Sequence, residues 1–319
     1  MTTTPFDEFS FLSAQAAGIG VTAIPPVRRL TLPLPDGRTV SALHYGDPVT
    51  GEFAPPAVTF LHGAGLNAHT WDTTILALGR PALAIDLPGH GDSSWRADGA
   101  YTGRTLAADL ADVLAHWAPA PQLLVGQSLG GLCAAALAAA HPALVRALIV
   151  VDISPGLDPN GWASQIRAFF AGPSDWASRE ELVDRALAFG FGGSREAATR
   201  GVFLNSRIRE DGRVEWKHHF AHLAHLLATD RAAAAAADTA AAASTGVLSA
   251  AGWDDLAAVA VPLTLIRGER GYVSPADVDE YARRLPAAEI ITVEAGHNVQ
   301  EDVPVRLAAL IAERVDDAR

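Results

Sequence analysis

Gly126-Gln127-Ser128-Leu129-Gly130-Gly131 is the stretch that decides the fold of this chain of 319 residues. It has the form G-x-S-x-G and lies between an apolar run at 122–125, which predicts a strand, and an alanine-rich run at 129–140, which predicts a helix. A serine at such a junction adopts a strained backbone conformation and exposes its hydroxyl at the carboxyl end of the strand. The flanking glycines remove side chains that would collide with the neighbouring strand and helix. We therefore expect Ser128 to be a nucleophile.

Strand and helix patterns alternate on both sides of this junction. The apolar runs predict a hairpin over 28–45 and strands over 57–61, 82–85, 147–151, 262–266 and 289–293. Helical spacing predicts helices over 69–78, 104–117, 274–284 and 304–315. Such alternation is typical of a mostly parallel central sheet with helices on both faces, so we predict the α/β fold class.

The alternation stops between residues 155 and 246, where the pattern is mostly helical and residues 232–243 are almost entirely alanine. The chain is long enough for one large domain that carries an insertion. We expect an N-terminal arm over 1–26, a core formed by 27–154 and 247–319, and a helical cap inserted over 155–246.

Four motifs together resemble the α/β-hydrolase superfamily. They are the serine motif, Leu61-His62-Gly63-Ala64-Gly65, Asp86-Leu87-Pro88-Gly89-His90-Gly91-Asp92-Ser93 and Glu294-Ala295-Gly296-His297. The resemblance implies the α/β-hydrolase fold with an inserted helical cap. It also implies an oxyanion hole formed by the backbone N–H groups of Leu129 and Ala64, with Gly63 bordering the substrate. His62, His90 and Asp86 are interpreted as residues that shape loops.

His297 is the predicted general base, because it follows a strand near the C-terminus and this fold uses the order serine, acid, histidine. The acid does not follow the pattern of most relatives. They carry it three residues beyond the glycine that ends the penultimate strand, and here that position holds Gly271. Glu269 is two residues out of register, and Asp277 fits a helix start that Ser274 caps.

Asp152 is the favoured acid. It ends the strand that follows the helix after Ser128, and certain haloalkane dehalogenases and zearalenone-lactonase-like enzymes place their acid there. This strand is expected beside the nucleophile strand, so the carboxylate can reach the same imidazole. Three alternatives stay open: Glu269 as the acid, a site without a conventional acid, and a structural role for Asp152 at the entry to the cap.

Aromatic and histidine side chains of the predicted cap are candidates for substrate binding. On a helix, Trp216 would share one face with Phe220, Leu223 and Leu227, while His218, His222 and His225 would share the opposite face. We assign Trp216, His218 and His222 to substrate binding, and tryptophan suits an apolar or aromatic substrate. No carboxylate or cysteine joins the histidines at suitable spacing, so we expect no metal and no cofactor.

These residues predict a serine hydrolase that cleaves a small-molecule carboxylic ester or lactone through an acyl-enzyme intermediate. The alternatives are C–C bond hydrolysis or a lyase reaction on the same fold, and a non-catalytic ligand-binding protein. A net charge of −12 argues against nucleic acid as a partner. No apolar run is long enough to span a membrane, and the first thirty residues lack an export-signal pattern. With the single Cys133, these features predict a cytoplasmic enzyme, and a homo-oligomer is left open.

Overall fold

The structure is a computed structural model that describes residues 7–156, 173–189, 192–223 and 251–316. An eight-stranded sheet has the order β1-β2-β4-β3-β5-β6-β9-β10. The pairs β1–β2 and β2–β4 are antiparallel, and all other neighbours are parallel. The strands are β1 (Val27–Pro33), β2 (Thr39–Tyr45), β3 (Val58–Leu61), β4 (Ala82–Asp86), β5 (Gln122–Gln127), β6 (Val145–Val151), β9 (Leu263–Gly268) and β10 (Glu289–Val293).

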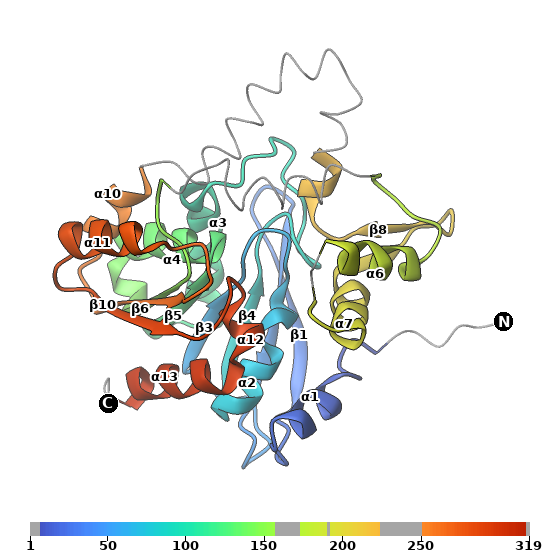
Figure 1. Cartoon of the computed structure of the whole chain (residues 1–319), viewed down its shortest axis with the longest axis horizontal. Coiled ribbons are helices and arrows are strands. Elements are labelled where there is room, and N and C mark those ends of the chain that lie inside the picture. Colours follow the sequence, from blue (N-terminus) through green and yellow to red (C-terminus); the bar gives the residue numbers. More distant parts are fainter. Residues whose placement is uncertain (1–6, 157–172, 190–191, 224–250, 317–319) are drawn as a thin grey trace.

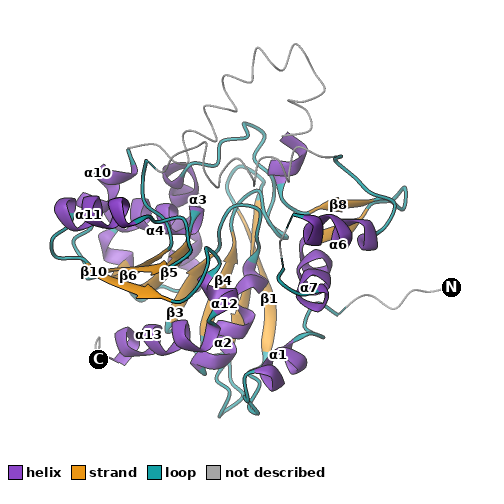
Figure 2. Cartoon of the chain, viewed as in Figure 1, coloured by secondary structure: helices purple, strands orange, loops and turns teal. Residues whose placement is uncertain are grey.

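Helices cover both faces of this sheet, as Figures 1 and 2 show. One face carries α3 (Gly103–Trp117), α4 (Leu129–Ala140), α10 (Gly252–Ala257) and α11 (Pro275–Arg284). The other face carries α2 (Asp72–Leu78), α12 (Val299–Asp302) and α13 (Pro304–Asp316). Two hydrophobic clusters fill the two spaces between sheet and helices. The predicted α/β fold, with a mostly parallel sheet between two helical layers, is therefore confirmed.

The serine of the motif follows β5, one of the buried strands at the centre of the sheet. Every residue of β3 and β5 is buried, as expected for parallel strands covered on both faces. All but the last two residues of α4 are buried, and its alanines let the helix pack closely on β5 and β6. The carboxyl ends of β3, β5, β6 and β9 meet at one edge, where open α/β sheets bind their ligands.

The inserted segment differs from its predicted helical structure. Its described part holds α6 (Arg179–Ala188), α7 (Arg195–Asn205) and an antiparallel hairpin of β7 (Ser206–Ile208) and β8 (Val214–Trp216). The helical face proposed for Trp216 and Phe220 is therefore wrong, because Trp216 ends a strand and the helical conformation begins only at His219. The turn at Asp211-Gly212, where Gly212 has a φ of 82°, closes the hairpin and decides against a helix.

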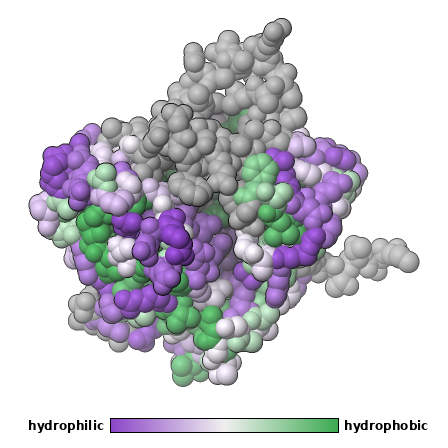
Figure 3. Space-filling model, viewed as in Figure 1, coloured by the Kyte–Doolittle hydropathy of each residue, from purple (hydrophilic) through white to green (hydrophobic). Residues whose placement is uncertain are grey.

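Several sequence features lie outside the described residues: Trp162, His225, Leu227 and the alanine run at 232–243. In the described part of the N-terminal arm, a helix without a predicted counterpart, α1 (Leu12–Gly18), packs against α2. No helix in the described ranges is long and apolar enough to cross a lipid bilayer. Hydrophilic side chains predominate along the outer edge of the cap in Figure 3.

A partly buried ionic network fixes the N-terminal arm to the edge of the sheet. Arg29 on β1 pairs with Glu8 of the arm, and its Nη1 lies 2.7 Å from Asp86 Oδ2. The imidazole of His69 lies between two carboxylates, with Nδ1 3.0 Å from Asp72 Oδ2 and Nε2 3.1 Å from Glu8 Oε2. Burial opposes protonation of His69, but the two carboxylates outweigh it and raise its pKa to about 9.

We predict that His69→Gln destabilises the protein only while His69 is charged. Because the pKa of His69 rises from 6.5 to about 9 on folding, its stabilising contribution is complete below pH 6.5 and disappears as the pH rises through 9. Urea unfolding of both proteins should give a difference in free energy that shrinks across this interval. His116→Gln, at an exposed position of α3, is the matched control. A difference that stays constant with pH would contradict the prediction.

Candidate active site

Ser128 occupies the tight turn between β5 and α4. Its backbone has a φ of 52° and a ψ of −121°, and only Asp152 shares a positive φ among the non-glycine residues of the described ranges. A Cβ atom on Gly126 would lie less than 3.0 Å from the backbone of Gly130, and one on Gly130 would lie equally close to the backbone of Leu61. The glycines therefore permit the close approach of strand, turn and helix that holds Ser128 in its strained conformation.

Two backbone N–H groups border the serine. Leu129 is the first residue of α4, so its N–H has no intrahelical acceptor and the positive end of the helix dipole lies beside Ser128. On the other side, a Cβ on Gly63 would lie 3.1 Å from the Ser128 Cβ, and Ala64 follows in the same loop. Neither Leu129 N–H nor Ala64 N–H donates a hydrogen bond to any residue that the structure describes. Both predicted oxyanion donors thus lie next to the serine and remain available to a ligand.

Asp152 and His297 contact each other, although 145 positions separate them in the chain. Nδ1 of His297 lies 2.7 Å from Oδ2 of Asp152, whose side chain is completely buried. The backbone N–H of Gly268 donates to Oδ1 (3.0 Å), and that of Tyr272 donates to Oδ2 (2.7 Å). Because the Nδ1–H of His297 bonds to the carboxylate, Nε2 is the nitrogen that can accept a proton.

Gly271, at the position that holds the acid in most relatives, leaves room for the carboxylate of Asp152. A Cβ atom on Gly271 would lie less than 3.0 Å from all three atoms of the Asp152 carboxylate. A side chain at residue 271 and a carboxylate supplied by residue 152 therefore exclude each other. Glu269, the alternative acid, is exposed. Of the carboxylates considered from the sequence, the fold brings that of Asp152 to His297.

Gln127 is a residue of the site that the sequence did not single out. Its buried side chain extends toward His297, with Nε2 3.0 Å from Nε2 of the imidazole and 3.3 Å from the His297 carbonyl oxygen. Among the described residues, no hydrogen bond joins His297 directly to Ser128. Catalytic hydrogen bonds are often long in substrate-free structures and tighten when substrate binds. The signal in the sequence that could have identified Gln127 is its position directly before Ser128.

Tyr272 is the second residue that the sequence did not single out. Its ring stacks on the imidazole of His297, with centroids 3.5 Å apart and planes inclined by 7°. Burial raises the pKa of the Tyr272 hydroxyl to about 12, and the charge of Asp152 adds to the effect. An uncharged aromatic face against an imidazole stabilises the imidazolium form. Tyr272 therefore orients both members of the pair, through its N–H to Asp152 and through its ring to His297.

We predict that Tyr272→Leu lowers kcat about fivefold, because the loss of the stacked ring removes roughly 1 kcal/mol of stabilisation from the imidazolium and frees its plane to rotate. Tyr272→Phe keeps the ring and should keep kcat close to that of the unsubstituted protein. Steady-state hydrolysis of a p-nitrophenyl ester gives kcat and KM for each variant. Equal kcat values for the Leu and Phe variants would show that the stack has no catalytic effect.

The cap residues assigned to substrate binding lie in three environments. Trp216 is buried in the cap, 6.0 Å from the ring of Trp176, which is a packing position. His218 is completely buried between Trp216 and His90, and burial lowers its pKa to about 3. His222 is half-buried beside the ring of Trp95. In the ranges that the structure describes, no group of three or more histidine, cysteine or acidic side chains is arranged to hold a metal ion.

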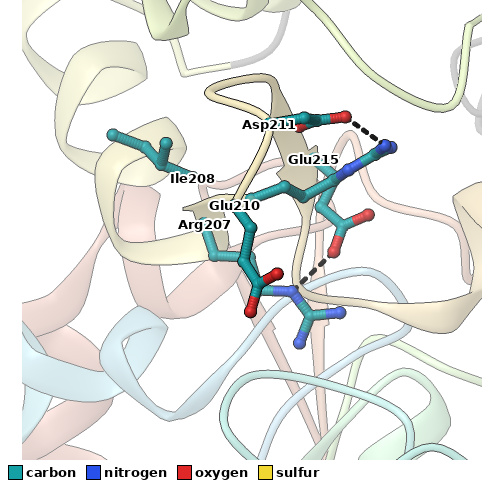
Figure 4. A pocket seen from close by; sticks show the side chains of 6 residues that line it. Arg207, Ile208, Glu210, Asp211 and Glu215 are labelled. Atoms are coloured by element: carbon teal, nitrogen blue, oxygen red, sulfur yellow. Dashed lines mark hydrogen bonds and ion pairs between the residues drawn. The ribbon is translucent and has the colours of Figure 1, made fainter.

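A shallow, open pocket lies on the hairpin of the cap (Figure 4). Two ion pairs join four of its side chains. Arg207 Nε lies 2.6 Å from Glu215 Oε1, and Arg209 Nη2 lies 2.5 Å from Asp211 Oδ2. The pocket is exposed and contains none of the residues assigned to the reaction. Its residues are Arg207, Ile208, Arg209, Glu210, Asp211 and Glu215.

Comparisons with known proteins agree with this geometry. Residues 60–310 match the model of the alpha/beta hydrolase family, and the chain belongs to that family. It is 35% identical to Esterase Rv0045c of Mycobacterium tuberculosis over 97% of this chain and 95% of that protein. A solved structure of that esterase covers 98% of this chain and 100% of its own, with a TM-score of 0.79. The mouse sn-1-specific diacylglycerol lipase ABHD11 is 30% identical over 80% of this chain and 79% of that protein.

Proposed function

We propose that this protein hydrolyses small-molecule carboxylic esters through an acyl-enzyme intermediate on Ser128. The contact between Asp152 and the Nδ1 of His297, beside a strained serine with two free N–H groups, carries the proposal. The prediction of an ester-cleaving α/β hydrolase is confirmed by the likeness to an esterase along almost the whole chain. The roles of the individual residues are the part that we propose.

In the first half of the proposed reaction, Ser128 Oγ attacks the ester carbonyl carbon while Nε2 of His297 accepts its proton. Nε2 must first leave the amide of Gln127, which still has the His297 carbonyl oxygen at 3.3 Å and Asn298 Oδ1 at 3.4 Å as acceptors. The N–H groups of Leu129 and Ala64 then bind the oxyanion. Asp152 holds the neutral imidazole in the required tautomer before the transfer and stabilises the imidazolium after it.

In the second half, the imidazolium of His297 donates its proton to the leaving alkoxide oxygen, and the alcohol departs. Water then attacks the acyl carbon while Nε2 accepts a proton from it. Collapse of the second tetrahedral intermediate breaks the bond between the acyl carbon and Ser128 Oγ, the imidazolium returns its proton to Oγ, and the carboxylic acid departs. A lactone is a cyclic ester and follows the same steps, so ring opening falls within the proposal.

The proposed substrate is uncharged and carries an apolar or aromatic group. Aromatic rings of cap and core meet beside His62, in the loop that follows β3. The ring centroid of Phe220 lies 5.2 Å from that of His90 and 5.3 Å from that of Tyr101, and the centroids of His90 and His62 are 5.0 Å apart. A net charge of −12 disfavours anionic substrates. A cytoplasmic location, a homo-oligomeric state and contributions from Gly63, Trp216, His218 and His222 to substrate binding stay predictions.

A fluorophosphonate probe tests the nucleophile. We expect it to label the protein at one site, because the probe reacts with serines that an adjacent base activates and whose oxyanion is stabilised. Ser128→Ala should abolish labelling and ester turnover, and peptide mass spectrometry should locate the adduct on Ser128. Ser154, which is buried near the end of β6, provides the matched control Ser154→Ala. A folded protein that never labels would refute the proposed function.

The acid is tested by a matched pair of substitutions. We predict that Asp152→Asn lowers kcat by about three to four orders of magnitude, as loss of the correct tautomer does in related triads, while Glu269→Gln changes it little. The exclusion between residues 152 and 271 gives a sharper test. Gly271→Asp alone should inactivate the enzyme by collision with Asp152, whereas Asp152→Gly with Gly271→Asp should recover activity above that of Asp152→Asn. Loss of activity in Glu269→Gln would instead assign the acid to Glu269.

A further inference from the structure

The cap and the oxyanion loop, defined here as residues 62–67, exchange two side-chain amide hydrogen bonds. Asn205, the last residue of α7, donates from Nδ2 to the carbonyl oxygen of Gly65 (2.6 Å). In return, Asn67 donates from Nδ2 to the carbonyl oxygen of Leu204 (3.1 Å). Both asparagines are buried, so neither bond is exposed to competition from bulk solvent. Cap and core are thus joined in the loop that carries Ala64.

The bond from Asn205 continues through the backbone of the loop. The carbonyl of Gly65 and the N–H of Leu66 belong to one planar peptide group, and this N–H donates to the carbonyl oxygen of Gly63 (3.2 Å). The carbonyl of Gly63 in turn shares a peptide group with the N–H of Ala64. The chain of donors therefore runs from Asn205 through two peptide planes to the N–H that the proposed reaction uses at the oxyanion.

Each end of this chain is held independently. On the cap side, the backbone N–H of Lys217 donates to the carbonyl oxygen of Asn205 (2.8 Å), which fixes the end of α7 against the hairpin. On the core side, Asn67 Oδ1 accepts from the N–H of His69 (3.0 Å) and caps the short helix η1 (Ala68–Trp71). The Gly65 carbonyl also fixes the orientation of the Asn205 amide, because only the amide nitrogen can bond to a carbonyl oxygen.

We propose that Asn205 is a positioning residue for the oxyanion hole, so that the seated cap orients and polarises the N–H of Ala64. Aligned hydrogen bonds strengthen one another, and the Asn205 amide and the Leu66 N–H donate in the same direction along the chain that ends at the N–H of Ala64. The cap then takes part in transition-state stabilisation in addition to covering the site. The inference rests on the proposed function, because it assumes an oxyanion bound by Ala64.

The test compares Asn205→Ala and Asn205→Asp with the unsubstituted protein in p-nitrophenyl ester hydrolysis. The Asp variant keeps the shape of the side chain but removes the donor. We expect kcat to fall about tenfold to a hundredfold in both, somewhat less than when an oxyanion donor is removed outright, with KM changed less than twofold. The affinity for a trifluoromethyl ketone, which forms a tetrahedral oxyanion on the serine, should fall by the same factor as kcat.

Lys217→Met is the matched control, because it removes a side-chain contact between cap and core and keeps the backbone N–H of residue 217 that donates to Asn205. Lys217 Nζ lies 3.0 Å from Asp92, and this ion pair does not reach the oxyanion loop. The control should leave both kcat and ketone affinity unchanged. Asn205→Ser, which leaves a smaller cavity than Ala and adds no buried charge, serves if the other variants unfold, and thermal melting checks each protein.

Three outcomes are distinguishable. Parallel losses in kcat and ketone affinity for the Asn205 variants, absent from Lys217→Met, support the inference. A rise in KM with unchanged kcat and unchanged ketone affinity overturns it and leaves Asn205 with a structural role in the cap. If the unsubstituted protein neither turns over esters nor reacts with the fluorophosphonate, the proposed function itself fails, independently of Asn205.

Discussion

The buried carboxylate of Asp152 is the interaction on which the site depends. An ionised carboxylate without partners would be very costly to bury, and here three N–H donors satisfy it: the imidazole of His297 and the backbone of Gly268 and Tyr272. These donors come from the end of β9 and from the loops after β9 and β10, while Asp152 itself follows β6. One side chain thus fixes the loops of three neighbouring strands relative to one another and to the serine.

The position of the Asp152 carboxylate after β6 has consequences elsewhere in the chain. Residue 271 cannot carry a side chain, because a Cβ there would collide with the carboxylate of Asp152. Asp152 itself adopts a φ of 47°, a conformation that costs energy in a residue other than glycine and that the surrounding bonds maintain. Ser128 carries the corresponding strain at the end of β5. The proposed nucleophile and acid therefore follow adjacent strands, each in a strained turn, and the side chain of Asp152 reaches His297.

The cap contacts two of the loops that shape the site. Asn205 bonds to the oxyanion loop, and the backbone N–H of His219 donates to the carbonyl oxygen of Gly89 (2.8 Å) in the loop after β4. The indole of Trp95 adds a bond to the carbonyl oxygen of Lys217 (2.8 Å). The cap is consequently bonded to the loops of the proposed active site through backbone carbonyl groups. Because every residue has such a carbonyl group, the identities of the side chains do not predict these bonds.

The sequence by itself determined the parts of this protein that depend on neighbours along the chain. The turn around Ser128 and the apolar periods of the core strands and helices are local, because backbone sterics and side-chain alternation act over a few residues. Tertiary structure decided that Asp152, the acid favoured from the sequence, meets His297, and that Gln127 lies beside the same imidazole. Those outcomes depend on strand order and on contacts between residues more than a hundred positions apart, such as Asp152 and His297, and no local pattern records such contacts.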